Sequence, residues 1–153
     1  MASTDCGFDD IPGGASGCDS LVTWGPTLTV DIGFDPTFTA SSTGTPVPGK
    51  TGLAALVDTG ATESCIDSQL AAQLNLPVID KRMTAGAHGA KEVNVHLAQI
   101  HIPSFGKTII GAFAGVDLRA GGQFHSALIG RTFLRHVRMT YDGKTGKVEI
   151  SDL

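Results

Sequence analysis

The segment with the clearest potential for chemistry is Asp58-Thr59-Gly60-Ala61, which directly follows the apolar run 53–57. A carboxylate at the end of a buried strand loses hydration, so it must be hydrogen-bonded, paired or shifted in its pKa. Thr59 places a hydroxyl beside it, and Gly60 and Ala61 are small enough for backbone N–H groups to approach the carboxylate. This pattern is compatible with acid–base chemistry by Asp58. An ordinary turn is the alternative, because Asp-Thr-Gly is also common turn chemistry.

A second apolar run, 127–129, lies about seventy residues later and stops at Gly130-Arg131. It predicts another buried strand. Beyond it, Phe133, Leu134 and Val137 recur at helical spacing and predict a short helix over 131–138. Between the two runs, residues 83–90 are rich in small residues, and Gly86-Ala87-His88-Gly89 predicts the tip of a hairpin.

These segments together resemble the retropepsin family, the retroviral-type aspartic proteases. The family pattern Ala/Leu-Leu-Val/Leu-Asp-Thr-Gly-Ala is similar to residues 55–61, and its later aliphatic residues, Gly-Arg and leucine-containing helix are similar to residues 127–134. The family carries a glycine-rich hairpin in the place of residues 83–90. Residues 26–32 are similar to its first strand. The resemblance covers roughly residues 21–150, and the chain looks more like bacterial or retrotransposon-type single-domain members than a viral enzyme.

The resemblance implies a mostly β fold, a single-domain closed barrel or sandwich with a flap hairpin and two short helices. Only one Asp-Thr-Gly occurs in the chain, which is half of a pepsin-type site. The family's solution is a homodimer in which the two copies of Asp58 share one proton and activate a water that hydrolyses a peptide bond. Thr59 then holds the two loops together, and Gly60 lies against the substrate backbone. This chemistry needs no metal and no cofactor.

The resemblance also implies that a peptide or protein substrate binds extended, as an added strand between flap and floor. Gly130 and Arg131 are expected to be structural. In the family this arginine packs against an acidic residue just after the Asp motif. Here Thr62 and Glu63 stand at those positions, so either Glu63 takes that role or Arg131 pairs elsewhere. Apolar pockets are expected around Leu53, Ile109 and Ile129, and the expected substrate contacts are Ala61, Gly86, Ala87, His88, Gly89 and Ile129.

Two other function classes remain open. A non-catalytic peptide-binding or dimerisation module would keep the fold without turnover. An acyl-transfer enzyme would use Ser64 or Cys65, but the chain has no Gly-x-Ser-x-Gly and no triad-like order. An inert buried thiol is the expected state of Cys65. His96 and His101 are expected to be surface residues rather than metal ligands.

Composition excludes other classes of protein. Eleven Lys and Arg against fifteen Asp and Glu give a net charge of −4, which argues against nucleic-acid binding. The longest nearly apolar run, 108–116, contains two glycines and is half the length of a membrane span. Three cysteines, Cys6, Cys18 and Cys65, fit neither a disulfide framework nor a zinc site, so reduced thiols and a cytoplasmic location are expected.

The 153 residues predict one domain. Residues 1–20 show no periodicity and are expected to be a flexible tail, with the protease-like domain over 21–153. A loop is expected over 35–50, where prolines gather. We predict about eight short strands, including a terminal hairpin over 137–150, and two helices: one over 67–74, capped by Ser64 or Asp67, and the one over 131–138.

Overall fold

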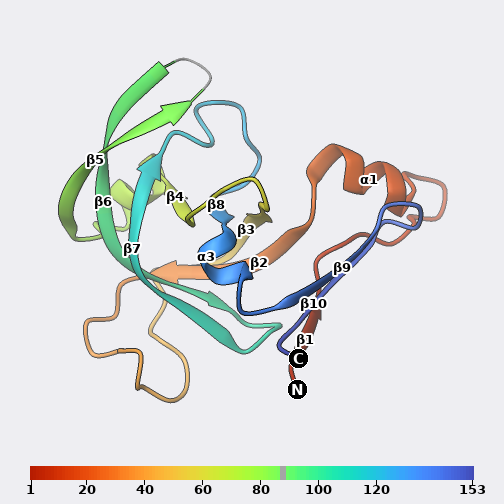
Figure 1. The fold of residues 1–153 in the computed structure, drawn as a ribbon, viewed down its shortest axis with the longest axis horizontal. Coiled ribbons are helices and arrows are strands. Elements are labelled where there is room, and N and C mark those ends of the chain that lie inside the picture. Colours follow the sequence, from red (N-terminus) through yellow and green to blue (C-terminus); the bar gives the residue numbers. More distant parts are fainter. Residues whose placement is uncertain (87–88) are drawn as a thin grey trace.

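The computed structural model describes residues 1–86 and 89–153. The described chain forms ten strands and three short helices, arranged in two sheets (Figure 1). In chain order the elements are β1 (Ser3–Asp5), α1 (Gly17–Trp24), β2 (Thr27–Gly33), β3 (Lys50–Val57), β4 (Cys65–Asp67), α2 (Ser68–Gln73), β5 (Val78–Gly86), β6 (Gly89–Ile102), β7 (Lys107–Val116), β8 (Ala127–Ile129), α3 (Arg131–Leu134), β9 (Arg138–Asp142) and β10 (Lys147–Ser151).

The larger sheet closes into a barrel. Its strand order is β2-β3-β8-β4-β7-β6-β5, and β2 also pairs with β6, through residues 31–33 and 99–101. The ring therefore contains six strands, and β5 stays outside it as the hairpin partner of β6. The β5–β6 hairpin rises from the barrel at the upper left of Figure 1. The expected mostly β fold with a closed barrel is confirmed.

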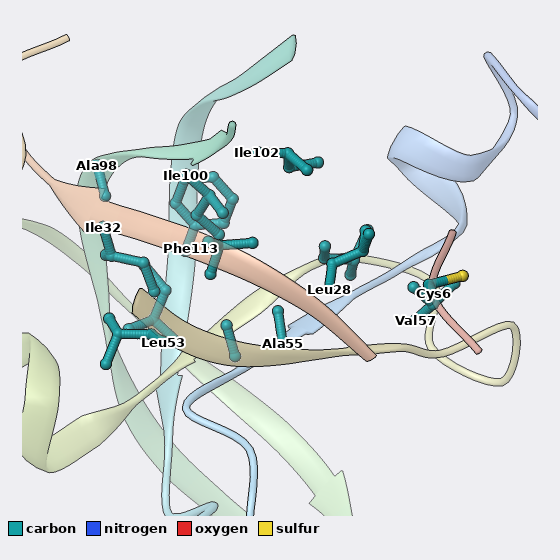
Figure 2. Packing of buried hydrophobic residues seen from close by; sticks show 14 of the residues in the cluster. Cys6, Leu28, Ile32, Leu53, Ala55, Val57, Ala98, Ile100, Ile102 and Phe113 are labelled. Carbon is teal, nitrogen blue, oxygen red and sulfur yellow. The ribbon is translucent and has the colours of Figure 1, made fainter. Parts of the chain in front are cut away.

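The barrel core comes from the alternation of strand residues. Leu28, Val30 and Ile32 of β2 point inward and are almost wholly buried, while intervening residues face outward. They pack with buried residues of β3 and β6 such as Ala55 and Ile100 (Figure 2). This packing gives the barrel a rigid wall from which the loop after β3 emerges.

The smaller sheet has the order β1-β10-β9 and brings the two chain ends together (Figure 1). This corrects the prediction of a flexible tail over residues 1–20. Thr4 lies opposite Ile150, and the Cys6 side chain is 1% exposed. The backbone of Cys6 bridges β10 and β2, donating to Val148 O at 2.9 Å and accepting from Thr27 N at 2.8 Å. No local periodicity revealed this strand, because its partner lies at the other end of the chain.

Most of the remaining elements follow the sequence prediction. The terminal hairpin and the loop over 35–50 are present, and α2 begins after Asp67, whose Oδ2 accepts from Leu70 N at 3.2 Å. Asp67 rather than Ser64 is therefore the cap. The helix expected over 131–138 is shorter, because Arg138 already belongs to β9.

His96 differs from its expected surface position. Its side chain is 5% exposed, and its Nδ1 lies 3.2 Å from Leu76 O. β6 is an inner strand of the sheet at this point, since His96 pairs with Val78 of β5 on one side and Phe113 of β7 on the other. His101 is half-buried and contacts Thr108 Oγ1 through Nδ1 at 2.8 Å.

His125 anchors the chain just before β8. It is 2% exposed, its Nε2 lies 2.8 Å from Thr27 Oγ1, and its Nδ1 lies 3.1 Å from Gln123 Nε2. Burial lowers the pKa of this imidazole below its ordinary value. The folded protein therefore holds His125 neutral at a pH where the unfolded chain binds a proton.

We predict that the free energy of unfolding falls as the pH drops below about 6.5, the ordinary histidine pKa. The His125→Gln variant should lose this slope, which for one group is at most about 1.4 kcal/mol per pH unit. Urea unfolding at pH 7.5 and 5.0 measures it. Substitution of the exposed His136 by Gln is the control. An unchanged slope in His125→Gln would contradict the assignment.

Candidate active site

Asp58 is positioned by the pairing of β3 with β8. The two strands run parallel, with Val57 opposite Ile129, and the ladder continues when Asp58 N donates to Ile129 O at 2.9 Å. The chain then turns, with Ala61 N donating to Asp58 O at 3.2 Å. Gly60 N donates to Asp58 Oδ1 at 2.9 Å, so the half-buried carboxylate is oriented by its own loop.

Arg131 braces the loop that carries Asp58. Its Nη1 donates to Thr59 O at 2.7 Å and its Nη2 to Thr62 Oγ1 at 3.0 Å. Its backbone N–H donates to Ala61 O at 2.9 Å. The guanidinium thus joins Thr59 and Thr62 with geometry that a forked side chain provides, and the Arg131 backbone adds a third contact to the loop. Arg131 therefore pairs with Thr59 and Thr62 and not with Glu63, which pairs with Arg82 instead.

Gly130 allows the backbones of the two loops to touch. Its N–H donates to Ser64 Oγ at 3.0 Å. A Cβ at this position would lie 2.6 Å from the carbonyl carbon and oxygen of Glu63 and 3.0 Å from Ala61 O. Any side chain here would push the Asp58 loop away from α3, so glycine is required by close approach.

A groove of about 470 Å³ runs between the Asp58 loop and the β5–β6 hairpin. The charged pair Glu63 and Arg82 joins its two walls. No local sequence pattern predicts this ion pair, because Glu63 lies in the Asp58 loop and Arg82 lies on β5. The groove is lined by residues 61–65 of the loop and β4, 82–85 of β5, and Ala114 and Val116 of β7.

The expected contact residues are only partly brought to this groove. Ala61 lines it, whereas Ile129 is 0% exposed and packs in the barrel core. This corrects the expectation for Ile129. Side chains alternate along a strand, so its neighbour Leu128 packs instead in the small cluster of Cys65 and Ala114 beneath the groove. Leu128 was missed because the run 127–129 is apolar throughout and shows no alternation.

The other residues expected to contact substrate are also only partly found near the groove. Leu53 is buried in the core, and Ile109 lines a separate cavity of about 410 Å³. Gly86 and Gly89 pair at the end of the β5–β6 hairpin. Ala87 and His88 lie outside the described residues, so their contacts stay predictions.

Asp58 also opens onto a second hollow, of about 550 Å³, on the side of the smaller sheet. It is lined by Pro26, Leu56 and Val57 and by Asp58 and Thr59. Met139 and Tyr141 of β9 form the remaining wall.

Ser64 and Cys65 lack the surroundings of a nucleophile. The Ser64 side chain is buried and its Oγ accepts the Gly130 N–H. Burial raises the pKa of the Cys65 thiol to about 11, and the nearby charge of Asp58 adds to the effect. Within residues 1–86 and 89–153 no histidine hydrogen-bonds to either side chain.

No group of three His, Cys, Asp or Glu side chains in the described chain is arranged to hold a metal ion. None of the described helices has the length and apolar character needed to cross a membrane.

We predict that Arg131→Lys lowers the free energy of unfolding by about 1–3 kcal/mol, because lysine cannot satisfy Thr59 O and Thr62 Oγ1 together. Urea denaturation of the two proteins measures the difference. The exposed Arg135→Lys is the matched control and should be neutral. Equal stability of Arg131→Lys and wild type would show that the brace contributes nothing.

Comparison with known proteins places these observations in a family. Among solved structures, the chain is similar to the EIAV protease complexed with the inhibitor HBY-793, with a TM-score of 0.47, 21% identity, and coverage of 72% of this chain and 85% of the other. It is also similar to the simian foamy virus (mac) protease in solution, with a TM-score of 0.45, 16% identity, and coverage of 71% and 91%.

The search of curated proteins finds no match to this chain. The family model described as "gag-polyprotein putative aspartyl protease" matches residues 46–136, which is more than half of the chain and includes both the Asp58 loop and the Arg131 brace. The chain therefore belongs to the gag-polyprotein aspartyl protease family and is retropepsin-like.

Proposed function

We propose that the chain is an aspartic endopeptidase whose active site forms when two copies bring their Asp58 side chains together. The observation that carries the proposal is the Asp58 carboxylate itself. It is half-buried, oriented by Gly60 N–H, and braced from behind by Arg131. The chain holds a single Asp-Thr-Gly, so one copy supplies half of a carboxylate pair.

The chemistry follows from two carboxylates held close together. Two like charges about 3 Å apart cannot both ionise, so the pair shares one proton. The ionised carboxylate takes a proton from a bound water, whose oxygen attacks the carbonyl carbon of the peptide. The protonated partner donates its proton to the carbonyl oxygen. Collapse of the tetrahedral intermediate breaks the C–N bond. The leaving nitrogen takes the proton that the first carboxylate removed from water, and a hydroxyl of the intermediate returns a proton to the second carboxylate.

The substrate is a peptide or protein segment bound in extended form. The groove beside the Asp58 loop supplies one wall through Ala61, and the β5–β6 hairpin serves as the flap over it. Gly60 lies against the substrate backbone, and Thr59 contacts its counterpart in the second copy. The three free thiols support a cytoplasmic location as part of this proposal.

The decisive variant is Asp58→Asn. Its amide oxygen can still accept the Gly60 N–H, so the fold and the dimer should survive while general acid–base catalysis is lost. Cleavage of a peptide library, read by mass spectrometry between about pH 4 and 7, should fall by about a hundredfold or more. The exposed Asp19→Asn removes the same charge elsewhere and should cleave like wild type.

The outcomes separate the function classes. Cleavage that survives in Asp58→Asn excludes the carboxylate mechanism. Library peptides that are bound but not cut by either protein would identify a binding module.

Thiol chemistry is tested independently by alkylation. Cys6 and Cys65 are buried, and burial raises their pKa to about 12 and about 11, so both thiols stay protonated at neutral pH. We predict that iodoacetamide at pH 7.5 modifies the partly exposed Cys18 first and leaves peptide cleavage unchanged. Mass spectrometry of the tryptic peptides locates the label. Rapid labelling of Cys65 with loss of cleavage would contradict this assignment.

A further inference from the structure

The first part of β7 is an open sheet edge. On one side β7 pairs with β6 along residues 107–114, but on its other side it meets β4 only through residues 114–116. Within the described chain no further strand pairs with residues 107–113, and no backbone hydrogen bond outside the strand ladders involves them. Alternate residues of such an edge direct unpaired N–H and C=O groups outward, where another strand can pair with them.

This edge borders the cavity of about 410 Å³, a groove that α3 also lines (Figure 1). We call it the β7 groove. Six consecutive residues of β7, 108–113, line it. Side chains alternate between the two faces of a strand, so an unbroken run of lining residues indicates that the strand meets the groove with its edge. Thr132, Phe133 and His136, in and just after α3, line it too. A groove lined by a strand edge and a helix has the form that accepts an added peptide strand.

The β7 groove adjoins the groove beside the Asp58 loop. Glu63 and Ser64 line both of them. Glu63 lies in the loop that carries Asp58, and Arg82 of the β5–β6 hairpin pairs with it. A polypeptide that lies extended beside the Asp58 loop therefore reaches the β7 edge when it continues past Glu63.

The lining of the β7 groove is mostly uncharged. Residues such as Ile109 and Phe133 supply apolar surface and pack against the barrel core. Of the described lining residues, only Glu63 and His136 can carry a charge, and Glu63 is already paired with Arg82. A charged segment would lose hydration here without gaining a partner. The groove therefore fits an uncharged segment rich in β-branched residues, which favour extended backbone.

We propose that the edge of β7 is a second docking site for the substrate. An uncharged segment, beyond the part that is cut at Asp58, pairs with residues 107–113 as an added strand. The inference rests on the proposed function, because the docked segment belongs to the peptide that the protease cleaves. The edge corresponds to about 23 Å of extended chain. The protease therefore prefers long, extended polypeptide segments that span both grooves over short peptides.

Substrate length tests the proposal. A peptide that the protease cleaves is extended at either end by the segment Thr-Val-Thr-Val-Thr-Val. The matched control carries the same extension with its amides N-methylated, which keeps the side chains but removes the N–H groups that pair with an edge. The first extension should lower KM about tenfold, or about 1.4 kcal/mol, and leave kcat unchanged, because docking stabilises the ground state and the transition state equally. The N-methylated extension should leave KM at the value of the unextended peptide.

Ala112→Lys tests the place of docking. Ala112 is exposed and lines the β7 groove, and a lysine on a strand edge obstructs strand addition. The variant should cleave the unextended peptide like wild type and lose the gain from the extension. Ala120→Lys makes the same change at an exposed position that lines neither groove, so it should keep the gain.

Direct binding separates docking from catalysis. The extension alone, made as a free peptide with a terminal lysine for solubility, is titrated into ¹⁵N-labelled Asp58→Asn protein. Docking should shift the amide signals of residues 108–113 and of α3 in NMR spectra. Adding Ala112→Lys to this protein should abolish the shifts.

Each result supports or overturns one of the two proposals. An equal KM for the three peptides overturns the docking site and leaves the protease standing. Amide shifts at β7 in a chain that cleaves no peptide overturn the protease and support the edge as a peptide-binding site. A chain with neither cleavage nor shifts overturns both. A wild-type dimer that dissociates in Ala112→Lys shows that a second copy occupies the edge, which also overturns substrate docking there.

Discussion

The structure depends on the meeting of two segments that lie about seventy residues apart in the chain. β3 and β8 pair in parallel, and the last backbone bond of this ladder, from Asp58 N to Ile129 O, sets where the carboxylate emerges. Parallel neighbours cannot be joined by a tight turn, so everything between them must be built as barrel wall, hairpin and groove. The Arg131 brace and the absent side chain of Gly130 then lock the loop against α3. The position of one carboxylate is thereby determined by the barrel as a whole.

The Asp58 loop has a rigid base and open surfaces beside it. The base of the Asp58 loop is held by strand pairing and by Arg131, whose side chain and backbone together contact three loop residues. Next to this loop lies a groove, whose walls are joined by Glu63 and Arg82. A separate hollow is lined by Asp58 and Thr59 together with residues of β3 and β9. The Asp58 carboxylate is therefore held by a rigid base and borders an open hollow.

Much of this could be predicted from the sequence, and the exceptions have physical causes. Local patterns of apolar residues, caps and turns predict four features: the Asp58 motif, β8, α2 and the terminal hairpin. β1 escaped notice because three residues paired with the far end of the chain leave no local period. Ile129 and Leu128 could not be told apart, because a run that is apolar throughout hides which face points to the core. The His96 side chain is buried next to Leu76 O and Gly115, which no spacing of histidines reveals. Contacts between distant elements, such as Glu63 with Arg82, are properties of the fold and not of any window of sequence.

The pairing of β1 with β10 also has a consequence for how the chain folds as it is made. Residues 3–5 form their strand only with residues 149–151, so the smaller sheet cannot assemble until the ribosome has released nearly the last residue described. The barrel strands β2 to β8 precede that point and can close earlier. Joining the most distant parts of the chain is a slow, non-local step. The surface next to Asp58 that includes β9 is therefore the last to appear, and a nascent chain carries its carboxylate without the sheet that borders it.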